Sequence, residues 1–152
     1  MTELMEQSVL PFGITEEQFS EVTIHFRVSS TKLMSGFDEI IIRGTGDVEL
    51  LTSAAATEKP EVKSGKVPRI VIYRLLQLLA AEGIEGWSPL YEADRRDYVA
   101  KVLTITLKGE RVTQVAMCRA EFAEFSRAYG ALKLVASLAA PEVVSGGFFN
   151  RI

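Results

Sequence analysis

Two side chains in this chain could form a nucleophilic pair. His25 is the single histidine and Cys118 the single cysteine among the 152 residues. A cysteine beside a histidine can act as a thiolate nucleophile, but such a pair also needs a third residue that orients the histidine, and the sequence identifies none. Cys118 also ends an apolar run, where cysteine usually behaves as a small buried hydrophobe. We therefore predict that no residue of the chain is catalytic.

The same two residues are too few for a metal centre. One histidine and one cysteine would need scattered carboxylates to complete a coordination shell. A zinc site of the multi-cysteine kind is excluded, because the chain has a single cysteine. We expect neither a metal nor a cofactor.

A glycine pair at Gly44-Thr45-Gly46 could suggest a loop that binds phosphate. The dinucleotide-binding fingerprint needs a third glycine and a helix directly afterwards, whereas a strand-like run, Asp47-Val48-Glu49-Leu50, follows here. Glycine supplies positive φ in tight hairpins. The segment therefore predicts a hairpin turn.

The densest run of charge spans Glu92 to Asp97 and is flanked by aromatic residues. Mixed charges on a loop usually form a solvated surface, and Trp87 could simply pack beneath such a loop. The other interpretation is recognition, because Arg, Trp and Tyr are enriched at binding hot spots. On that interpretation the binding residues are Trp87, Tyr91, Asp94, Arg95, Arg96 and Tyr98.

The C-terminal stretch carries Phe148 and Phe149 directly after Gly146-Gly147. Exposed aromatic area is normally buried against something, so this stretch either folds back on its own core or docks on another subunit. Gly130 and the alanines around it would let a second subunit approach the last helix closely. The candidate interface residues are Gly130, Phe148 and Phe149.

Composition limits the classes of partner. The chain has 17 basic and 20 acidic side chains, which are mixed along its length and give a net charge of -3. No basic stripe is available to neutralise phosphates, so we expect no nucleic-acid partner. The acidic start, Met1 to Ser8, is unlike a signal peptide, and no apolar run reaches the roughly 20 residues of a membrane span. With one cysteine, a reducing cytoplasm is the expected location.

Alternating and helical patterns predict the elements that hold these residues. Alternation runs through Val22 to Val28, Phe37 to Arg43, Asp47 to Leu51, Val99 to Leu107 and Arg111 to Cys118, and the last two flank Lys108-Gly109-Glu110. Thr52 to Lys66 reads as an exposed loop. Apolar stripes predict one helix over Pro68 to Glu82, stopped by Gly83, and a second over Ala120 to Ala140, stopped by Pro141.

Together these elements predict an α+β fold. Three strands, a helix, two strands and a helix suggest one mainly antiparallel sheet of about five strands with both helices on one face. The other face would carry Thr23, His25 and Arg27. We expect an arm over residues 1–18, in which Thr15 and Gln18 form a capping box, a single domain over 19–140 and a tail over 141–152.

Three stretches carry a resemblance to a known family: the Gly44 hairpin, the helix from Leu75 to Gly83, and the Thr-rich hairpin from Leu103 to Gly109. The chain resembles an uncharacterised family of small bacterial α+β domains that have this order of elements. Members often carry two cysteines around a glycine just before the first Gly-x-Gly strand. Residues 29–38 contain no cysteine here, so nothing attached to that pair transfers. The resemblance implies no activity.

These observations favour a non-enzymatic cytoplasmic protein that binds another protein, with a homodimer as one form. It would use the open sheet face or a sheet edge together with the Trp87 to Tyr98 loop. The alternative is a small-molecule binder or enzyme with a pocket between sheet and helices, formed by Tyr91, Asp94, Arg95 and Asp97. An apolar pocket with convergent polar groups would favour the alternative.

Overall fold

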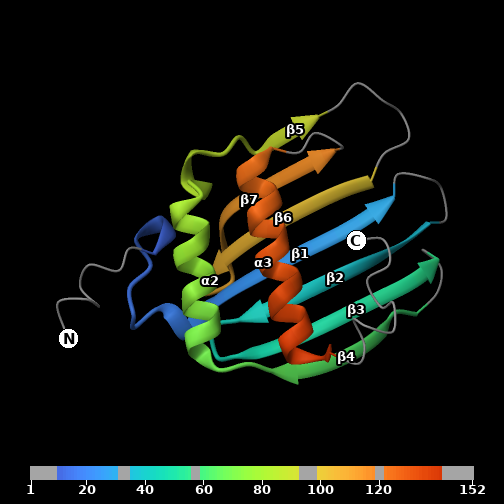
Figure 1. The fold of residues 1–152 in the computed structure, drawn as a ribbon, viewed down its shortest axis with the longest axis horizontal. Coiled ribbons are helices and arrows are strands. Elements are labelled where there is room, and N and C mark those ends of the chain that lie inside the picture. Colours follow the sequence, from blue (N-terminus) through green and yellow to red (C-terminus); the bar gives the residue numbers. More distant parts are fainter. Residues whose placement is uncertain (1–9, 31–34, 56–58, 93–98, 119–121, 142–152) are drawn as a thin grey trace.

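A computed structural model of the chain describes residues 10–30, 35–55, 59–92, 99–118 and 122–141, and it has two layers (Figure 1). One layer is a sheet of strands β1 (Val22–Ser30), β2 (Ser35–Arg43), β3 (Asp47–Ala55), β4 (Glu61–Lys66), β5 (Leu90–Glu92), β6 (Val99–Leu107) and β7 (Glu110–Cys118). The other layer holds helices α2 (Arg69–Ala81) and α3 (Ala123–Ala139). Short 3-10 turns are η1 (Pro11–Gly13), η2 (Phe19–Glu21) and η3 (Ile84–Gly86).

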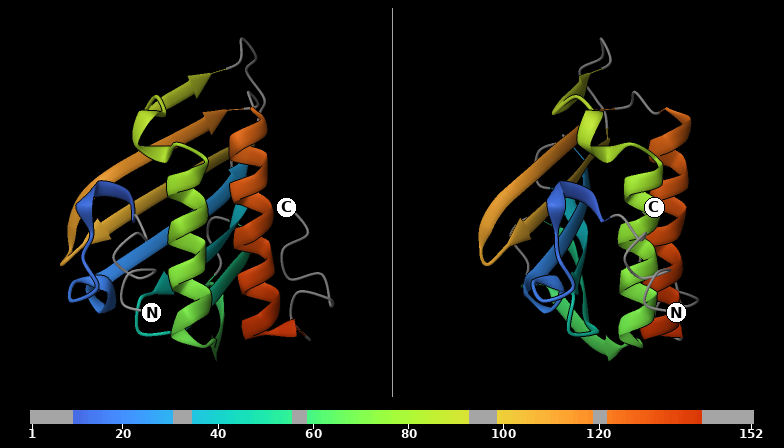
Figure 2. Two further views of the ribbon diagram at one scale, coloured as in Figure 1. Left: turned by 60° about the vertical axis from the view of Figure 1, so that its left-hand side comes forward. Right: turned by 90° about the vertical axis from the view of Figure 1, so that its left-hand side faces the viewer.

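The sheet has seven strands in the order β4-β3-β2-β1-β6-β7-β5. All neighbours are antiparallel except β5 and β7, which are parallel. Both helices cover the same face of the sheet (Figure 2). The predicted α+β class, the antiparallel sheet and the one-sided helices are confirmed, whereas the predicted strand count of about five was too low.

The two predicted hairpins are present. In the β2–β3 turn Gly46 has φ 99°, and a Cβ at Gly44 would lie 1.8 Å from the backbone oxygen of Phe19. Both glycines are therefore required, one by its dihedral angle and one by the close approach of another backbone. In the β6–β7 turn Lys108 and Gly109 both have positive φ, at 55° and 82°, as a two-residue hairpin turn demands.

The predicted loop over Thr52 to Lys66 is wrong. The strand β3 continues to Ala55, and Glu61–Lys66 forms the edge strand β4, paired with β3 from Asp47 opposite Lys66 to Thr52 opposite Glu61. All residues of β4 except Gly65 are exposed. The strand therefore lacks the alternation of apolar and polar residues that marks a half-buried strand. It is held by backbone hydrogen bonds to β3.

The core lies between the sheet and the two helices. Four side chains on the apolar sides of the predicted strands and helices are all buried there: Phe26, Leu75, Leu103 and Phe125. Phe26 also lies against the ring of Tyr129 on α3, with centroids 5.6 Å apart. The apolar stripes that predicted the helices therefore do face the sheet.

Each helix begins and ends near its predicted bounds. Pro68 is the N-cap residue directly before α2, and Gly83, with φ 81°, follows the end of the helix. At the other end of the helix layer a Cβ at Gly65 would lie 2.2 Å from the backbone oxygen of Ala139, so the last turn of α3 rests directly on the backbone of β4. No helix in the described residues is long and apolar enough to cross a bilayer.

The segment before β1 is partly built into the core. Leu10, Ile14 and Phe19 are buried, and Phe19 lies edge-on to Tyr73 of α2 at 5.7 Å between centroids. The predicted capping box is present: the Thr15 N–H donates to Gln18 Oε1 at 3.1 Å, and the Gln18 N–H donates to Thr15 Oγ1 at 3.3 Å. Residues 10–18 therefore pack against the domain.

Candidate binding face of the sheet

The face of the sheet opposite α2 and α3, here called the open face, is not covered by any described element (Figure 2). Side chains alternate across a strand, so the residues between the core positions lie on this face. The larger apolar ones are half-buried or exposed, and they are Phe37, Ile41, Leu51, Val62, Leu90 and Val102.

A charge cluster lies at the centre of the open face. Arg27 Nη1 donates to Glu39 Oε1 at 3.0 Å, and His25 Nε2 lies 3.3 Å from Glu39 Oε2. The Glu39 side chain is only 11% exposed. Its neighbours on β1 and β3 shield the carboxylate from the sides, and the hydrogen bond from the Arg27 guanidinium offsets the loss of water.

Arg27 is itself held in place. Its guanidinium carbon lies 4.0 Å from the centroid of the Phe37 ring, a cation–π arrangement. The same side chain also donates a hydrogen bond to Glu39. The face of the guanidinium plane and one of its N–H groups therefore both have partners. The open face therefore presents a positioned cation beside a positioned anion.

Apolar residues flank this cluster along one cross-strand row. The register places Val62 beside Leu51, Leu51 beside Glu39, and Arg27 beside Val102. The row thus runs from exposed Val62 through two central charges to half-buried Val102. Arginine and large apolar or aromatic side chains on one surface are typical of the residue composition of protein-binding surfaces.

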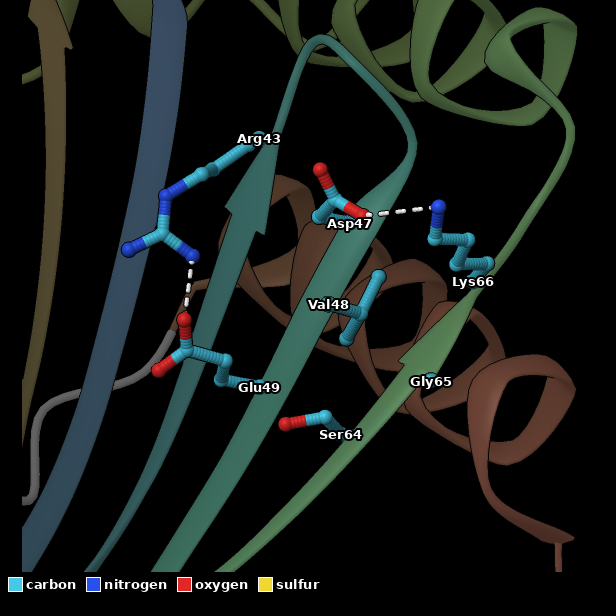
Figure 3. Close-up of a pocket in the computed structure, with 7 residues that line it drawn as sticks. All are labelled: Arg43, Asp47, Val48, Glu49, Ser64, Gly65 and Lys66. Atoms are coloured by element: carbon cyan, nitrogen blue, oxygen red, sulfur yellow. Dashed lines mark hydrogen bonds and ion pairs between the residues drawn. The ribbon is translucent and has the colours of Figure 1, made fainter.

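A shallow hollow lies at the β2–β3 turn end of the same face (Figure 3). Its volume is about 510 Å³, and it is lined by Arg43, Asp47, Val48, Glu49, Ser64, Gly65 and Lys66. Arg43 Nη1 donates to Glu49 Oε1 at 2.6 Å, and Lys66 Nζ lies 3.7 Å from Asp47 Oδ1. The charged groups of the hollow therefore pair with one another, and they do not converge on an apolar cavity.

Neighbouring carboxylates do not form an acid–base pair. Asp38 precedes Glu39 on β2, so the two side chains point to opposite faces. Asp38 is fully buried on the helix side, where it accepts a hydrogen bond from the Thr52 hydroxyl. Their opposite directions keep the two groups from sharing one substrate.

The register also separates His25 from Cys118. His25 pairs with Thr104, and Thr104 pairs with Gln114. Cys118 lies four residues farther along β7, so its Cα is about 17 Å from that of His25 at ordinary strand rise and spacing. This separation is too long for a nucleophile and base in contact. Among the described residues no three His, Cys, Asp or Glu side chains are grouped to hold a metal.

Two of the predicted binding residues contribute to packing. Trp87 donates its Nε1–H to the Glu82 backbone oxygen at 3.1 Å and lies edge-on to Phe122 at 5.0 Å between centroids. The Tyr91 ring is 4.7 Å from that of Phe122, and its hydroxyl accepts a hydrogen bond from the Ser88 N–H at 2.9 Å. Both side chains fasten the β5 segment to the start of α3. The other four, Asp94, Arg95, Arg96 and Tyr98, lie outside the described residues, as does Asp97.

Of the three candidate interface residues, Gly130 lies within the described part of the chain. Gly130 is exposed on α3, and a Cβ built on it would have no atom within 4 Å. Packing among the described residues therefore does not require glycine at this position. On the same outer side of α3, Leu134 and Leu138 are 62% and 54% exposed. Phe148 and Phe149 lie outside the described residues.

Alternation along the sequence predicts that His25 and Arg27 lie on the open face, but it does not identify their partner Glu39 or the apolar residues beside the cluster. One signal was available in β2, where Ile40, Ile41 and Ile42 follow one another. An apolar residue on both sides of a strand indicates that neither sheet face is simply solvated. No protein-family model matches the chain, and no match to it was found among curated proteins.

Proposed function

We propose that this chain is a non-enzymatic cytoplasmic protein that binds another protein through the open face. The observation that carries the proposal is the Glu39 cluster: a carboxylate 11% exposed, held by Arg27 and His25 and flanked by apolar side chains. Fixed charges set the register of a partner, and the apolar side chains beside them supply the area that is removed from water.

The chemistry of the open face favours protein over other partners. It carries both signs of charge, whereas a nucleic-acid surface needs a basic excess. Its side chains include Arg27 stacked on Phe37, and Arg and aromatic residues are enriched at protein interfaces. The charged groups of the hollow at its end pair with one another, whereas a small-molecule pocket directs polar groups at its ligand.

The alternative function, a small-molecule pocket near the Trp87 to Tyr98 loop, has less support. Trp87 and Tyr91 are engaged with Phe122. The remaining members of that predicted pocket lie outside the described residues. We therefore retain the open face as the binding surface.

A matched pair of leucine substitutions tests the proposal. Leu51→Arg changes an apolar residue of the open face, and Leu134→Arg makes the same change on the outer side of α3, where the leucine is 62% exposed. Tagged chains are cross-linked in the native host and the captured proteins are quantified. We expect the wild type and Leu134→Arg to capture the same partner and Leu51→Arg to lose it by about tenfold or more.

Thermal melting of both variants controls for folding. Equal capture by a folded Leu51→Arg chain and the wild type would show that the open face is not the binding surface.

A further inference from the structure

The outer edge of β4 is the longer of the two sheet edges. In the sheet order β4 and β5 are terminal, and β4 spans six residues against three for β5. Within the described ranges no strand pairs with the outer side of β4 (Figure 1). A free edge is a template for another strand.

The register shows which backbone groups face outward. The Val67 N–H donates to the Gly46 oxygen at 2.9 Å, so Val67 directs its backbone groups at β3. These groups alternate in direction along a strand. Those of Gly65, Lys63 and Glu61 therefore also point at β3, whereas those of Lys66, Ser64 and Val62 point away from the sheet.

Three exposed side chains lie along the middle of this edge. Glu61 and Lys63 project on the helix side of the sheet, with 3.7 Å between Glu61 Oε1 and Lys63 Nζ, and their side chains are 64% and 50% exposed. Val62 lies between them on the open face and is 50% exposed. Along the edge, the side chains are therefore an anion at Glu61, an apolar residue at Val62 and a cation at Lys63.

We infer that this edge binds a second copy of the chain, with the two β4 strands antiparallel about Val62. In that register Val62 lies opposite Val62 of the second copy, and each donates its outward N–H to the other's carbonyl oxygen. Glu61 then lies opposite Lys63 of the second copy, and Lys63 opposite its Glu61. The four charges alternate in sign around a square, because each carboxylate has one lysine on its own strand and one across the junction.

The neighbouring registers are less favourable. Pairing about Lys63 would place two lysines directly opposite each other, and like charges at such positions are destabilising. Pairing about Ser64 would place Val62 opposite Lys66 and Lys63 opposite Gly65, which leaves no charge pair. Charged edge residues generally block strand addition, but here they permit one self-complementary register.

The same register extends the open face. Leu51 lies beside Val62 within one chain, so the junction would align Leu51 and Val62 of both copies in one apolar row. Pro60 has no N–H and ends the ladder on each side. The contact is small, so we expect a weak dimer of the transient class.

This inference rests on the premise of the proposed function that the chain binds protein, and it shares Leu51 with the open face, but it is tested on the purified chain alone. Two charge variants are made, Glu61→Lys and Lys63→Glu, and sedimentation velocity is measured at roughly 100 µM, a concentration suited to a small interface. We expect the wild type to dimerise, each variant alone to remain monomeric, and an equimolar mixture to form a heterodimer. The mixture restores association because every 61–63 pair across the junction again joins a lysine to a glutamate.

Two further variants separate edge pairing from general charge effects. Val62→Pro removes an N–H that points away from β3, so the sheet should persist while the dimer is lost. Lys66→Glu makes the same charge change as Lys63→Glu but lies beyond the paired stretch, and it should dimerise like the wild type. A monomeric wild type, or variants that dimerise as well alone as when mixed, would overturn the inference without affecting the partner-capture result for Leu51→Arg.

Discussion

Glu39 provides the negative charge at the centre of the open face. Its carboxylate has an arginine on one oxygen and a histidine on the other, so removing either partner changes the surface that a binding protein would meet. A buried charge that loses its partner is costly, whereas an exposed one is not. The importance of Glu39 therefore depends on its low exposure as well as on its charge.

We predict that the two residues capable of nucleophilic chemistry can be replaced without loss of function. His25→Gln keeps a hydrogen-bond donor near Glu39, and Cys118→Ser lies far from it along the register. Each change should alter stability by about 1 kcal/mol or less, as is usual away from special features. Thermal melting and partner binding are measured together, and loss of partner binding at unchanged stability would show that the replaced residue has a functional role.

Gly65 is predicted to be sensitive because of backbone contact. In Gly65→Ala the new methyl would meet the Ala139 oxygen at 2.2 Å, so α3 must move off β4. We expect a cost of about 1–3 kcal/mol, the range for overpacking, visible as a lower midpoint in urea unfolding. Ser64→Ala, one residue earlier on the open face, serves as control, and equal midpoints for the two variants would contradict the close approach.

At the scale of elements, a helix or hairpin could be predicted where the sequence has both a periodic apolar pattern and a residue that marks a turn or an end. The hairpin at Gly44 to Gly46 combined alternation with a glycine turn, and α3 combined a stripe with Pro141. The strand β4 had neither signal, because an edge strand exposed on both sides needs no apolar period. The three-residue β5 is shorter than any periodic pattern, and its pairing with β7 comes from tertiary contact. Glu39 was missed for a similar reason, since its partners come from a different strand.

The facing core layers predict large costs for truncation. Phe26→Ala, Leu75→Ala, Leu103→Ala and Phe125→Ala should each destabilise the fold by about 2–5 kcal/mol through lost burial and a residual cavity. Leu134→Ala, at a site 62% exposed, should change stability by less than about 0.5 kcal/mol. Costs below about 1 kcal/mol at two of the four core sites would contradict the packing described above.

An ion pair joins the end of α2 to the first turns of α3. Arg127 Nε donates to Glu82 Oε1 at 2.8 Å, and Nη2 lies 2.7 Å from Oε2. The hydrogen bond from Arg127 holds the pKa of Glu82 below its ordinary value, against the opposite effect of burial, and the positive charge adds to it. Because the folded pKa is the lower one, the contribution of the pair is present at neutral pH and is lost as the pH falls through that pKa.

Arg127→Gln should therefore melt below the wild type at neutral pH. The difference should shrink as the pH falls below the ordinary glutamate pKa of about 4.3 and close below the lowered pKa of Glu82, where this group is protonated in both states. Arg111→Gln removes an exposed arginine that bonds Gln114 rather than a carboxylate, and its difference from the wild type should not vary with pH in this way. A gap for Arg127→Gln that persists unchanged into acid would show that the pair does not carry the effect.

At the scale of the whole molecule, the surfaces among the described residues that we propose for assembly are the open face and the β4 edge, where Val62 is 50% exposed. Exposed apolar area of this kind is usually covered by a partner. We predict that the chain self-associates and that Phe148 and Phe149 strengthen the assembly.

Sedimentation of the full chain and of a chain ending at Val144 tests this prediction. The shorter chain should dissociate at a higher concentration, because aromatic area buried on association is lost. If both forms associate equally, the tail takes no part in the assembly; if both are monomeric up to roughly 100 µM, the chain does not self-associate.

The position of β1 has a consequence for synthesis. β1 pairs on one side with β2, which follows it directly, and on the other with β6, where Val22 lies opposite Leu107. During translation at about 5–20 residues per second, β1 waits several seconds for that second neighbour. Its apolar side chains and free backbone edge are exposed in that interval, as in other nascent sheets with distant pairings. The central strand of the finished sheet is therefore the segment of the nascent chain with most need of a chaperone.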